Sequence, residues 1–245
     1  MSALDAVVLI LGGAAAGFIN TLAGGGSAIT IPILTEMVGI SVANGTNRIA
    51  ILLANLAAVA GFQKEGVVPW RSVVPLIVPA VLGAAAGAWV ATVTAPGVMR
   101  KVFALVLVLV AASVLLRPSR WLEERDAVLH EPWRSAVFFA IGFYGGFVQA
   151  GVGFLLLAGL VLGGGLNLVN GNAAKAALIA CYMPVALLLF ARASQVDWAV
   201  GAVLALGQMS GALIATRFAV VKGAGWVRWV LVFAAVLAAI RLALA

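Results

Sequence analysis

The chain has 245 residues, of which 64% are hydrophobic and only 9% are charged, and its mean hydropathy is +1.18. Soluble domains carry about 25% charged residues, so this composition excludes a soluble globular protein and predicts an integral membrane protein. Most basic residues behind the net charge of +7 lie beside apolar segments, where they orient spans, so the charge does not indicate nucleic-acid binding. The single cysteine excludes an internal disulfide and a Cys-rich metal site. The single histidine, His130, lies in the polar linker without the partners that a His-based metal site or a Ser-His-Asp triad would need.

Apolar segments fill the first half of the chain. Four of them are candidates for membrane-spanning helices: residues 4–22, 43–62, 73–93 and 98–116. Residues 28–40 form a fifth, shorter segment, which as a helix would rise only about 20 Å against a hydrocarbon core of about 30 Å. We therefore predict that this segment is a half-helix, a re-entrant segment or a short, well-supported span.

Three successive glycines, Gly24, Gly25 and Gly26, separate the first segment from the short one. They disfavour a continuous helix, and backbone freed by such a break in lipid must be buried in protein or line a wet cavity. A new helix start after the break also offers backbone N–H groups to an anion. Close packing of helices through small residues is the alternative. The same pattern recurs in the second half, and this recurrence favours an anion site over close packing of helices.

The second half repeats the first, with apolar segments at residues 135–150, 154–168, 173–190, 199–218 and 226–244. Gly24 and Gly26 align with Gly151 and Gly153, and Arg48 aligns with Lys175. We predict an all-α polytopic membrane protein of two homologous halves. Each half contains a broken or short helix pair and three longer transmembrane helices. The first repeat covers residues 1–116, a cytoplasmic linker 117–132, and the second repeat 133–245. Such repeats are typical of secondary transporters.

Basic residues indicate how the halves are oriented, since they accumulate on the cytoplasmic side. If each half crosses the membrane five times, nine basic residues share one side: Lys64, Arg71, Arg117, Arg120, Arg125, Arg134, Arg217, Lys222 and Arg228. Only Arg100, Lys101 and Arg192 lie on the other side. Four crossings per half give a weaker bias of seven against five. Inverted repeats, with both termini in the periplasm, are therefore favoured.

Arg48 and Lys175 are the strongest candidates for a binding role, because charges inside a membrane are costly. Each follows a polar cluster near a helix start, which predicts an anion site without a metal or cofactor. Snorkelling of both side chains to the interface is the alternative. The full candidate set is Arg48, Lys175, Asn20, Thr21, Gly24, Gly25, Gly26, Ser27, Asn44, Asn47, Gln149, Gly151, Gly153, Asn170 and Asn172.

Four further residues receive individual interpretations. Asn55 and Tyr182 occupy matched positions in the two halves and are candidates to line the path. Asp197 directly precedes an apolar segment and is interpreted as a helix N-cap. Glu36 could pair with a basic residue or relay a proton, but a position at the membrane interface is favoured.

The motif GFINTLAGGGSAITIPIL…VANGTNRIAILLANLAAVAGF, with its looser copy GFYGGFVQAGVGFLLLAGLVL…NGNAAKAALIACYMPVALLLF, resembles the sulfite exporter TauE/SafE family of membrane permeases. The resemblance covers nearly the whole chain. Ala28 stands where the family pattern has its last glycine, and the second copy lacks the proline that corresponds to Pro32. The resemblance implies movement of sulfite, sulfoacetate or a related organosulfonate across the cell inner membrane.

Three classes of function remain to be compared. The leading hypothesis is a secondary transporter, in the exporting direction, that works by alternating access around an anion site at the repeat interface. The alternative is an anion channel with a fixed pore, which could use the same site. A membrane enzyme lacks support, because no HExxH, GxSxG, cysteine pair or intramembrane carboxylate pair occurs. The expected partners are a small anion and the lipid bilayer, without nucleic acid. The oligomeric state is left open, with a homodimer as one alternative.

Overall fold

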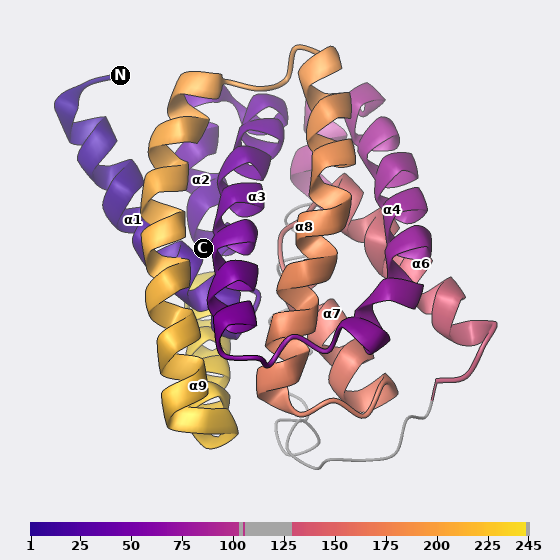
Figure 1. Cartoon of the computed structure of the whole chain (residues 1–245). Coiled ribbons are helices and arrows are strands. Elements are labelled where there is room, and N and C mark those ends of the chain that lie inside the picture. The colour runs from indigo at the N-terminus through magenta and orange to yellow at the C-terminus, as the bar shows by residue number, and fades with distance from the viewer. Residues whose placement is uncertain (103–104, 106–128, 244–245) are drawn as a thin grey trace.

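A computed structural model describes residues 1–102, 105 and 129–243, with side chains described up to Lys222. All regular elements in these residues are helices (Figure 1). The first half contains α1 (Ala3–Leu22), α2 (Ser27–Val38), α3 (Ile40–Lys64) and α4 (Trp70–Val93). The second half contains α6 (Trp133–Phe147), α7 (Val152–Ala158), the π-helix η2 (Gly159–Gly163), α8 (Leu168–Arg192) and α9 (Trp198–Ala243). Most of the last apolar segment predicted in the first half, 98–116, and most of the linker, 117–132, lie outside the described residues.

Five stretches of the described residues are long and apolar enough to cross a membrane: α1, α3, α4, α8 and residues 198–222 of α9. The short segment of the first half is the 12-residue helix α2, as predicted. Its counterpart is the equally short α7 and η2 together. The sequence predicted separate segments at 199–218 and 226–244, whereas the helical structure of α9 is continuous; Figure 1 shows that the chain turns back at the lower end of α9. A glycine inside a helix costs only about 1 kcal/mol, so Gly223 and Gly225 need not interrupt it.

The helices form two bundles, and each bundle contains elements from both halves of the sequence (Figure 1). In the first bundle α1, α2 and α3 pack with residues 198–222 of α9, and in the second α4 packs with α6, α7, η2 and α8. Helices α3 and α8 make the main contact between the bundles. The chain passes from the first bundle to the second at the lower end, between α3 and α4. It returns at the upper end, between α8 and α9.

Close approach of glycines allows the tightest helix crossings. A Cβ on Gly17 of α1 would lie 2.1 Å from the carbonyl oxygen of Gln208 in α9. A Cβ on Gly146 of α6 would lie 2.1 Å from the carbonyl oxygen of Ala84 in α4. No side chain fits at such distances. The first helix of each half therefore packs backbone to backbone on the fourth helix of the other half.

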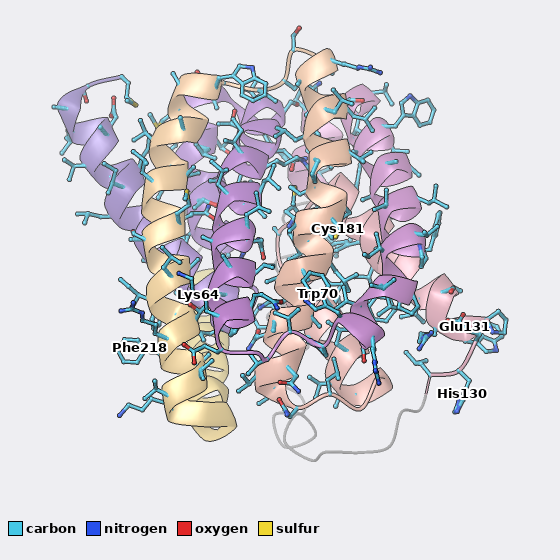
Figure 2. All side chains as sticks on the ribbon, viewed as in Figure 1. Lys64, Trp70, His130, Glu131, Cys181 and Phe218 are labelled. Carbon is cyan, nitrogen blue, oxygen red and sulfur yellow. The ribbon has the colours of Figure 1, made fainter. Side chains whose placement is uncertain are left out.

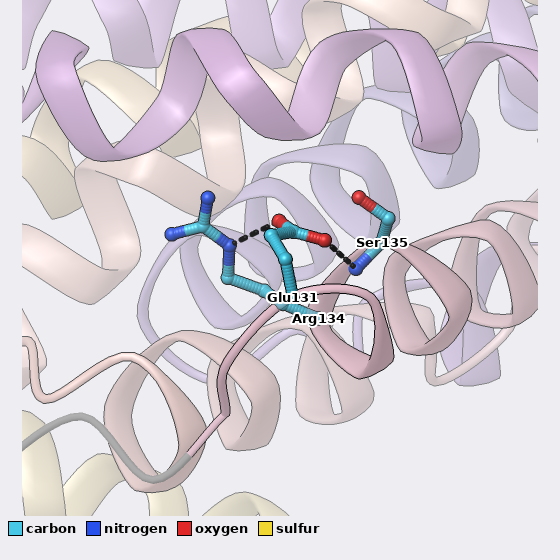
Figure 3. A network of polar contacts seen from close by, with 3 residues as sticks. All are labelled: Glu131, Arg134 and Ser135. Carbon is cyan, nitrogen blue, oxygen red and sulfur yellow. Dashed lines mark hydrogen bonds and ion pairs between the residues drawn. The ribbon is translucent and has the colours of Figure 1, made fainter.

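Aromatic and charged side chains mark the two ends of the molecule. Trp70 and Trp133 start α4 and α6, Trp198 starts α9 at the opposite end, and all three are exposed, as expected for interface anchors. Lys64 and Trp70 lie toward the lower end with Glu131 (Figure 2). Glu131 accepts hydrogen bonds from Arg134 Nε at 2.8 Å and from the Ser135 backbone N–H at 3.2 Å (Figure 3). These contacts fix the beginning of α6.

Candidate functional site

The two helix breaks predicted from the glycines are present and touch each other. α1 ends at Leu22 and Gly24 then adopts a φ of 89°; α6 ends at Phe147 and Gly151 adopts a φ of 75°. A Cβ on Gly24 would lie 2.4 Å from Gly153 Cα, and a Cβ on Gly153 only 2.2 Å from Gly24 Cα. Glycine is thus required twice over at Gly24, by the left-handed backbone and by the contact between the breaks.

Arg48 lies in the third turn of α3 and is completely buried. Its Nη2 donates to the carbonyl oxygen of Gly146 at 2.5 Å and its Nη1 to that of Gly145 at 3.2 Å. Asn44 lies one turn earlier and shares this environment: its Nδ2 donates to the carbonyl oxygen of Phe147 at 2.9 Å, and its Oδ1 accepts from Arg48 at 3.3 Å. Arg48 therefore binds the last turn of α6, where helical carbonyls have no partner within the helix.

Lys175 of α8 is equally buried and makes the corresponding contacts with α1. Its Nζ donates to the carbonyl oxygens of Asn20 and Thr21, both at 2.9 Å, and to Asn172 Oδ1 at 2.7 Å. Asn172 Nδ2 in turn donates to the carbonyl oxygen of Leu22 at 3.1 Å. Each basic residue thus holds the C-terminal end of the first helix in the other half. Snorkelling to the interface is wrong for both, because their charged ends lie among interior carbonyls.

The surroundings of Arg48 leave part of the guanidinium unpaired. The Arg48 Cζ lies 4.2 Å from the centre of the Phe190 ring, which supplies a cation–π contact. Arg48 Nε is buried and makes no hydrogen bond with any described residue. Among the described residues, no carboxylate forms an ion pair with Arg48 or Lys175. Two buried cations are therefore balanced only by neutral groups there, and helix C-termini carry a partial negative charge.

A second polar network lies within the first bundle. Asn47 Oδ1 accepts from Thr30 Oγ1 at 2.8 Å and from Gln208 Nε2 at 3.4 Å, and Asn47 Nδ2 donates to Ser27 Oγ at 3.3 Å. All four side chains are buried. Asn47 and Ser27 were predicted site residues. Sequence reasoning missed Thr30 and Gln208, although Gln208 is the one amide inside the apolar segment 199–218.

The remaining candidates divide into buried and peripheral residues. Asn20 and Thr21 offer main-chain carbonyls to Lys175, while the Thr21 hydroxyl donates to the carbonyl oxygen of Gly17 at 2.9 Å. Gln149 is buried and has a φ of 64°, and its Oε1 accepts from Tyr182 OH at 3.2 Å. Asn170 is partly exposed in the first turn of α8. Its backbone N–H donates to Asn167 Oδ1 at 2.9 Å, and no hydrogen bond among the described residues joins its side chain to Arg48 or Lys175.

Of the individually interpreted residues, Asp197 is the N-cap it was predicted to be, accepting from the Val200 N–H at 3.0 Å. Glu36 is exposed on α2, as a place at the interface requires. Asn55 and Tyr182 are both buried, and Asn55 Nδ2 donates within α3 to the carbonyl oxygen of Ile51 at 2.7 Å. This hydrogen bond of the Asn55 side chain therefore lies within α3 and does not involve Arg48 or Lys175.

Comparison with known proteins agrees with the membrane architecture. The family described as sulfite exporter TauE/SafE matches residues 9–242. The chain is 30% identical over 230 residues to the probable membrane transporter protein ORF9 of Sinorhizobium sp, covering 93% of this chain and 88% of that protein. It is also 30% identical over 216 residues to the probable membrane transporter protein YfcA of Escherichia coli K12, covering 87% and 80%. No solved structure matches. With five candidate spans and a family match over nearly its whole length, this chain belongs to the sulfite exporter TauE/SafE family of membrane transporters.

Proposed function

We propose that the protein is a secondary transporter that exports a small sulfur-containing oxyanion, such as sulfite, sulfoacetate or a related organosulfonate. Its anion site would lie where α3 and α8 meet the two helix breaks, with Arg48 and Lys175 as the charged ligands. The sulfur oxyanion and the outward direction rest on the family's description. Among relatives, the printed names go no further than membrane transport.

The burial of two cations without a carboxylate among the described residues is the observation that supports an anion site. Each helix C-terminus carries roughly half a negative charge, so the ends of α1 and α6 together offset about one of the two positive charges. An uncompensated charge in a low-dielectric interior costs several kcal/mol. A bound anion would supply the missing charge, and the unpaired Arg48 Nε is a donor available to it.

Alternating access is supported by the relation between the halves. Equivalent helices run in opposite directions, since α3 ends at the lower end where α4 begins, whereas α8 ends at the upper end where α9 begins (Figure 1). The matched glycine breaks meet near the basic residues of both halves. We infer inverted repeats, a design in which two equivalent conformations open the same site to opposite sides.

Thermal-shift measurements with purified protein test the ligand class. Sulfite, sulfoacetate and thiosulfate are compared with sulfate and taurine, and a stabilising shift by at least one of the first three is expected. Substrate-stimulated counterflow in proteoliposomes then tests the mechanism. A transporter exchanges internal for external substrate, whereas a channel with a fixed pore shows no counterflow. Absence of both binding and flux for every sulfur oxyanion would contradict the proposed substrate class.

A further inference from the structure

The bonds made by the two basic residues connect the two bundles rather than elements of one bundle. Arg48 belongs to α3 in the first bundle, and its carbonyl partners belong to α6 in the second. Lys175 belongs to α8 in the second bundle, and its carbonyl partners belong to α1 in the first. The cations that would bind the anion therefore also connect the bundles at their centre, beside the apolar contact of α3 with α8.

Asn44 and Asn172 reinforce both connections. Asn44 donates to the last carbonyl of α6 and Asn172 to the last carbonyl of α1, and each also accepts a hydrogen bond from the neighbouring cation. Each connection thus consists of one cation and one amide on a single helix C-terminus. The tight helix crossings through glycine lie within the bundles, between α1 and α9 and between α4 and α6, whereas between the bundles the two breaks touch at Gly24 and Gly153.

We propose that the bound anion competes with these carbonyls for Arg48 and Lys175, and that this competition releases the two bundles to move against each other. This inference rests on the anion site proposed above. The carbonyl bonds of Arg48 and Lys175 have a charged donor only, whereas an oxyanion carries full charge on the acceptor as well. Coulomb attraction between full charges therefore makes the oxyanion a better acceptor than a helix carbonyl. An anion that removes cross-bundle bonds favours the conformation in which those bonds are absent.

The moving units are consequently the bundles and not the halves of the sequence. Backbone-to-backbone crossings fasten α1 to α9 and α4 to α6, so helices from different halves must move together. Among the described residues, the chain passes between the bundles through residues 65–69 and 193–197. These two short connections are the hinges that the proposal requires.

Two pairs of spin labels distinguish bundles from halves in the full-length protein reconstituted in nanodiscs. Trp133 on α6 and Arg217 on α9 are exposed residues of the same half in different bundles. Val93 on α4 and Trp133 are exposed residues of different halves in the same bundle. Each position is replaced by cysteine in a Cys181→Ser background, which removes the chain's only cysteine. Distances are measured with and without saturating sulfite.

Sulfite should shift the 133–217 distance distribution and leave the 93–133 distribution unchanged. Motion of the sequence halves would produce the opposite pattern and would overturn the proposal. Unchanged distances for both pairs, in protein that sulfite stabilises against heat, would overturn it too.

A variant separates this proposal from the identity of the substrate. Arg48→Gln removes one connection without any ligand, so it should shift the 133–217 distribution in anion-free protein. That result would support the connection even if sulfite failed to bind and the proposed substrate were wrong. An unshifted distribution in folded Arg48→Gln protein would refute the connection. If that variant does not insert, Asn44→Ala is used instead, with a smaller shift in the same direction expected.

Discussion

Arg48 and Lys175 show how a charged residue can be buried without a carboxylate. Their hydrogen-bond acceptors are carbonyls in the last turns of α6 and α1, which the helices themselves leave unsatisfied. Each contact removes an orphan acceptor and places a cation at the negative end of a helix dipole. The same side chains are then available to an anion, so their structural role and their proposed binding role are compatible.

Substitution of the basic pair tests the binding role directly. Arg48→Gln should weaken anion binding more than Lys175→Gln, because a guanidinium can contact two oxygens while an ammonium acts as a point charge. A lost charge-assisted contact of about 1.5–3 kcal/mol corresponds to roughly a tenfold to hundredfold rise in Kd. Arg48→Lys should recover only part of the affinity. Titration of the best ligand against each purified variant measures the effect, and wild-type Kd in folded Arg48→Gln would remove Arg48 from the site.

Glu131 gives a pH-dependent prediction outside the membrane-spanning segments. Hydrogen bonds from Ser135 and from the Arg134 guanidinium lower the pKa of the Glu131 carboxyl below its usual 4.5. Because the pKa is depressed on folding, the stabilisation is complete above the unfolded value and disappears as pH falls through the folded value. As the pH falls below 4.5 we therefore expect the protection of the amides in the first turn of α6, relative to their intrinsic exchange rates at the same pH, to decrease. Glu131→Gln should remove this pH dependence, and an identical pH profile in that variant would contradict the assignment.

The helix breaks are the elements that organise the site. Gly24 and Gly151 reverse the backbone after α1 and α6, and contact between Gly24 and Gly153 brings the two breaks together. This arrangement exposes the final carbonyls of both helices to side chains from α3 and α8. A continuous helix would have used those carbonyls internally, so the breaks create the acceptors that Arg48 and Lys175 bind.

Gly25 tests whether the breaks lie on the path of the anion. It is the least buried of the three glycines, and its added Cβ would meet only the end of the Phe154 ring, at 3.0 Å. Gly25→Leu should therefore insert and purify but lose transport. Gly97→Leu is the control, because no atom lies within 4 Å of a Cβ at that exposed position. Normal flux through Gly25→Leu protein in proteoliposomes would exclude these glycines from the path.

The glycine crossings predict that alanine substitutions at two positions of α1, Gly12 and Gly17, have different effects on stability. Gly17→Ala places a methyl group against the Gln208 backbone, so we expect a loss of about 1–3 kcal/mol from overpacking. Gly12→Ala meets only the movable end of Ile33 at 3.1 Å and should be neutral, or stabilise the helix by up to about 1 kcal/mol. Thermal unfolding midpoints in detergent compare the two. Equal midpoints would mean that α1 and α9 separate without cost.

At the scale of the whole molecule, the repeats exchange helices. The first helix of each half packs against the fourth helix of the other half, and each basic residue holds a helix end of the other half. Neither half can complete its apolar core alone, and neither can provide hydrogen-bond donors for the last carbonyls of its own broken helix. The two halves of the sequence, predicted to be repeats, therefore do not pack as separate structural units.

Charge distribution predicts the orientation of this assembly. Lys64, Arg71 and Arg134 lie at the ends of α3, α4 and α6 that face downward in Figure 1, on the side predicted to be cytoplasmic. We expect both termini in the periplasm and the linker in the cytoplasm. Reporter fusions at Ala245 and near Glu124 measure this. A cytoplasmic reporter at Ala245 would contradict the predicted orientation, because Figure 1 shows the last part of α9 running back from the lower end of the molecule.

The sequence by itself determined the features that depend on local composition. Hydropathy identified the membrane class and most spans, and glycine clusters located both breaks, because conformational preference is decided within a few residues. The alignment of Arg48 with Lys175 singled out the basic pair, since an intramembrane charge is conspicuous in any apolar sequence. The sequence predicted an interruption between residues 218 and 226; the helical structure is continuous there, although Figure 1 shows the chain turning back at the lower end of α9.

Tertiary structure alone decided the partners of these residues. Arg48 bonds to residues about 98 positions away and Lys175 to residues about 155 positions away, through main-chain carbonyls that carry no signature in a sequence. The exchange of helices between the halves likewise depends on which apolar faces meet, and apolar periodicity is the same for any partner. Gln208 and Phe190 joined the buried residues for this reason: packing of α9 and α8 against α3 brings them to Asn47 and Arg48.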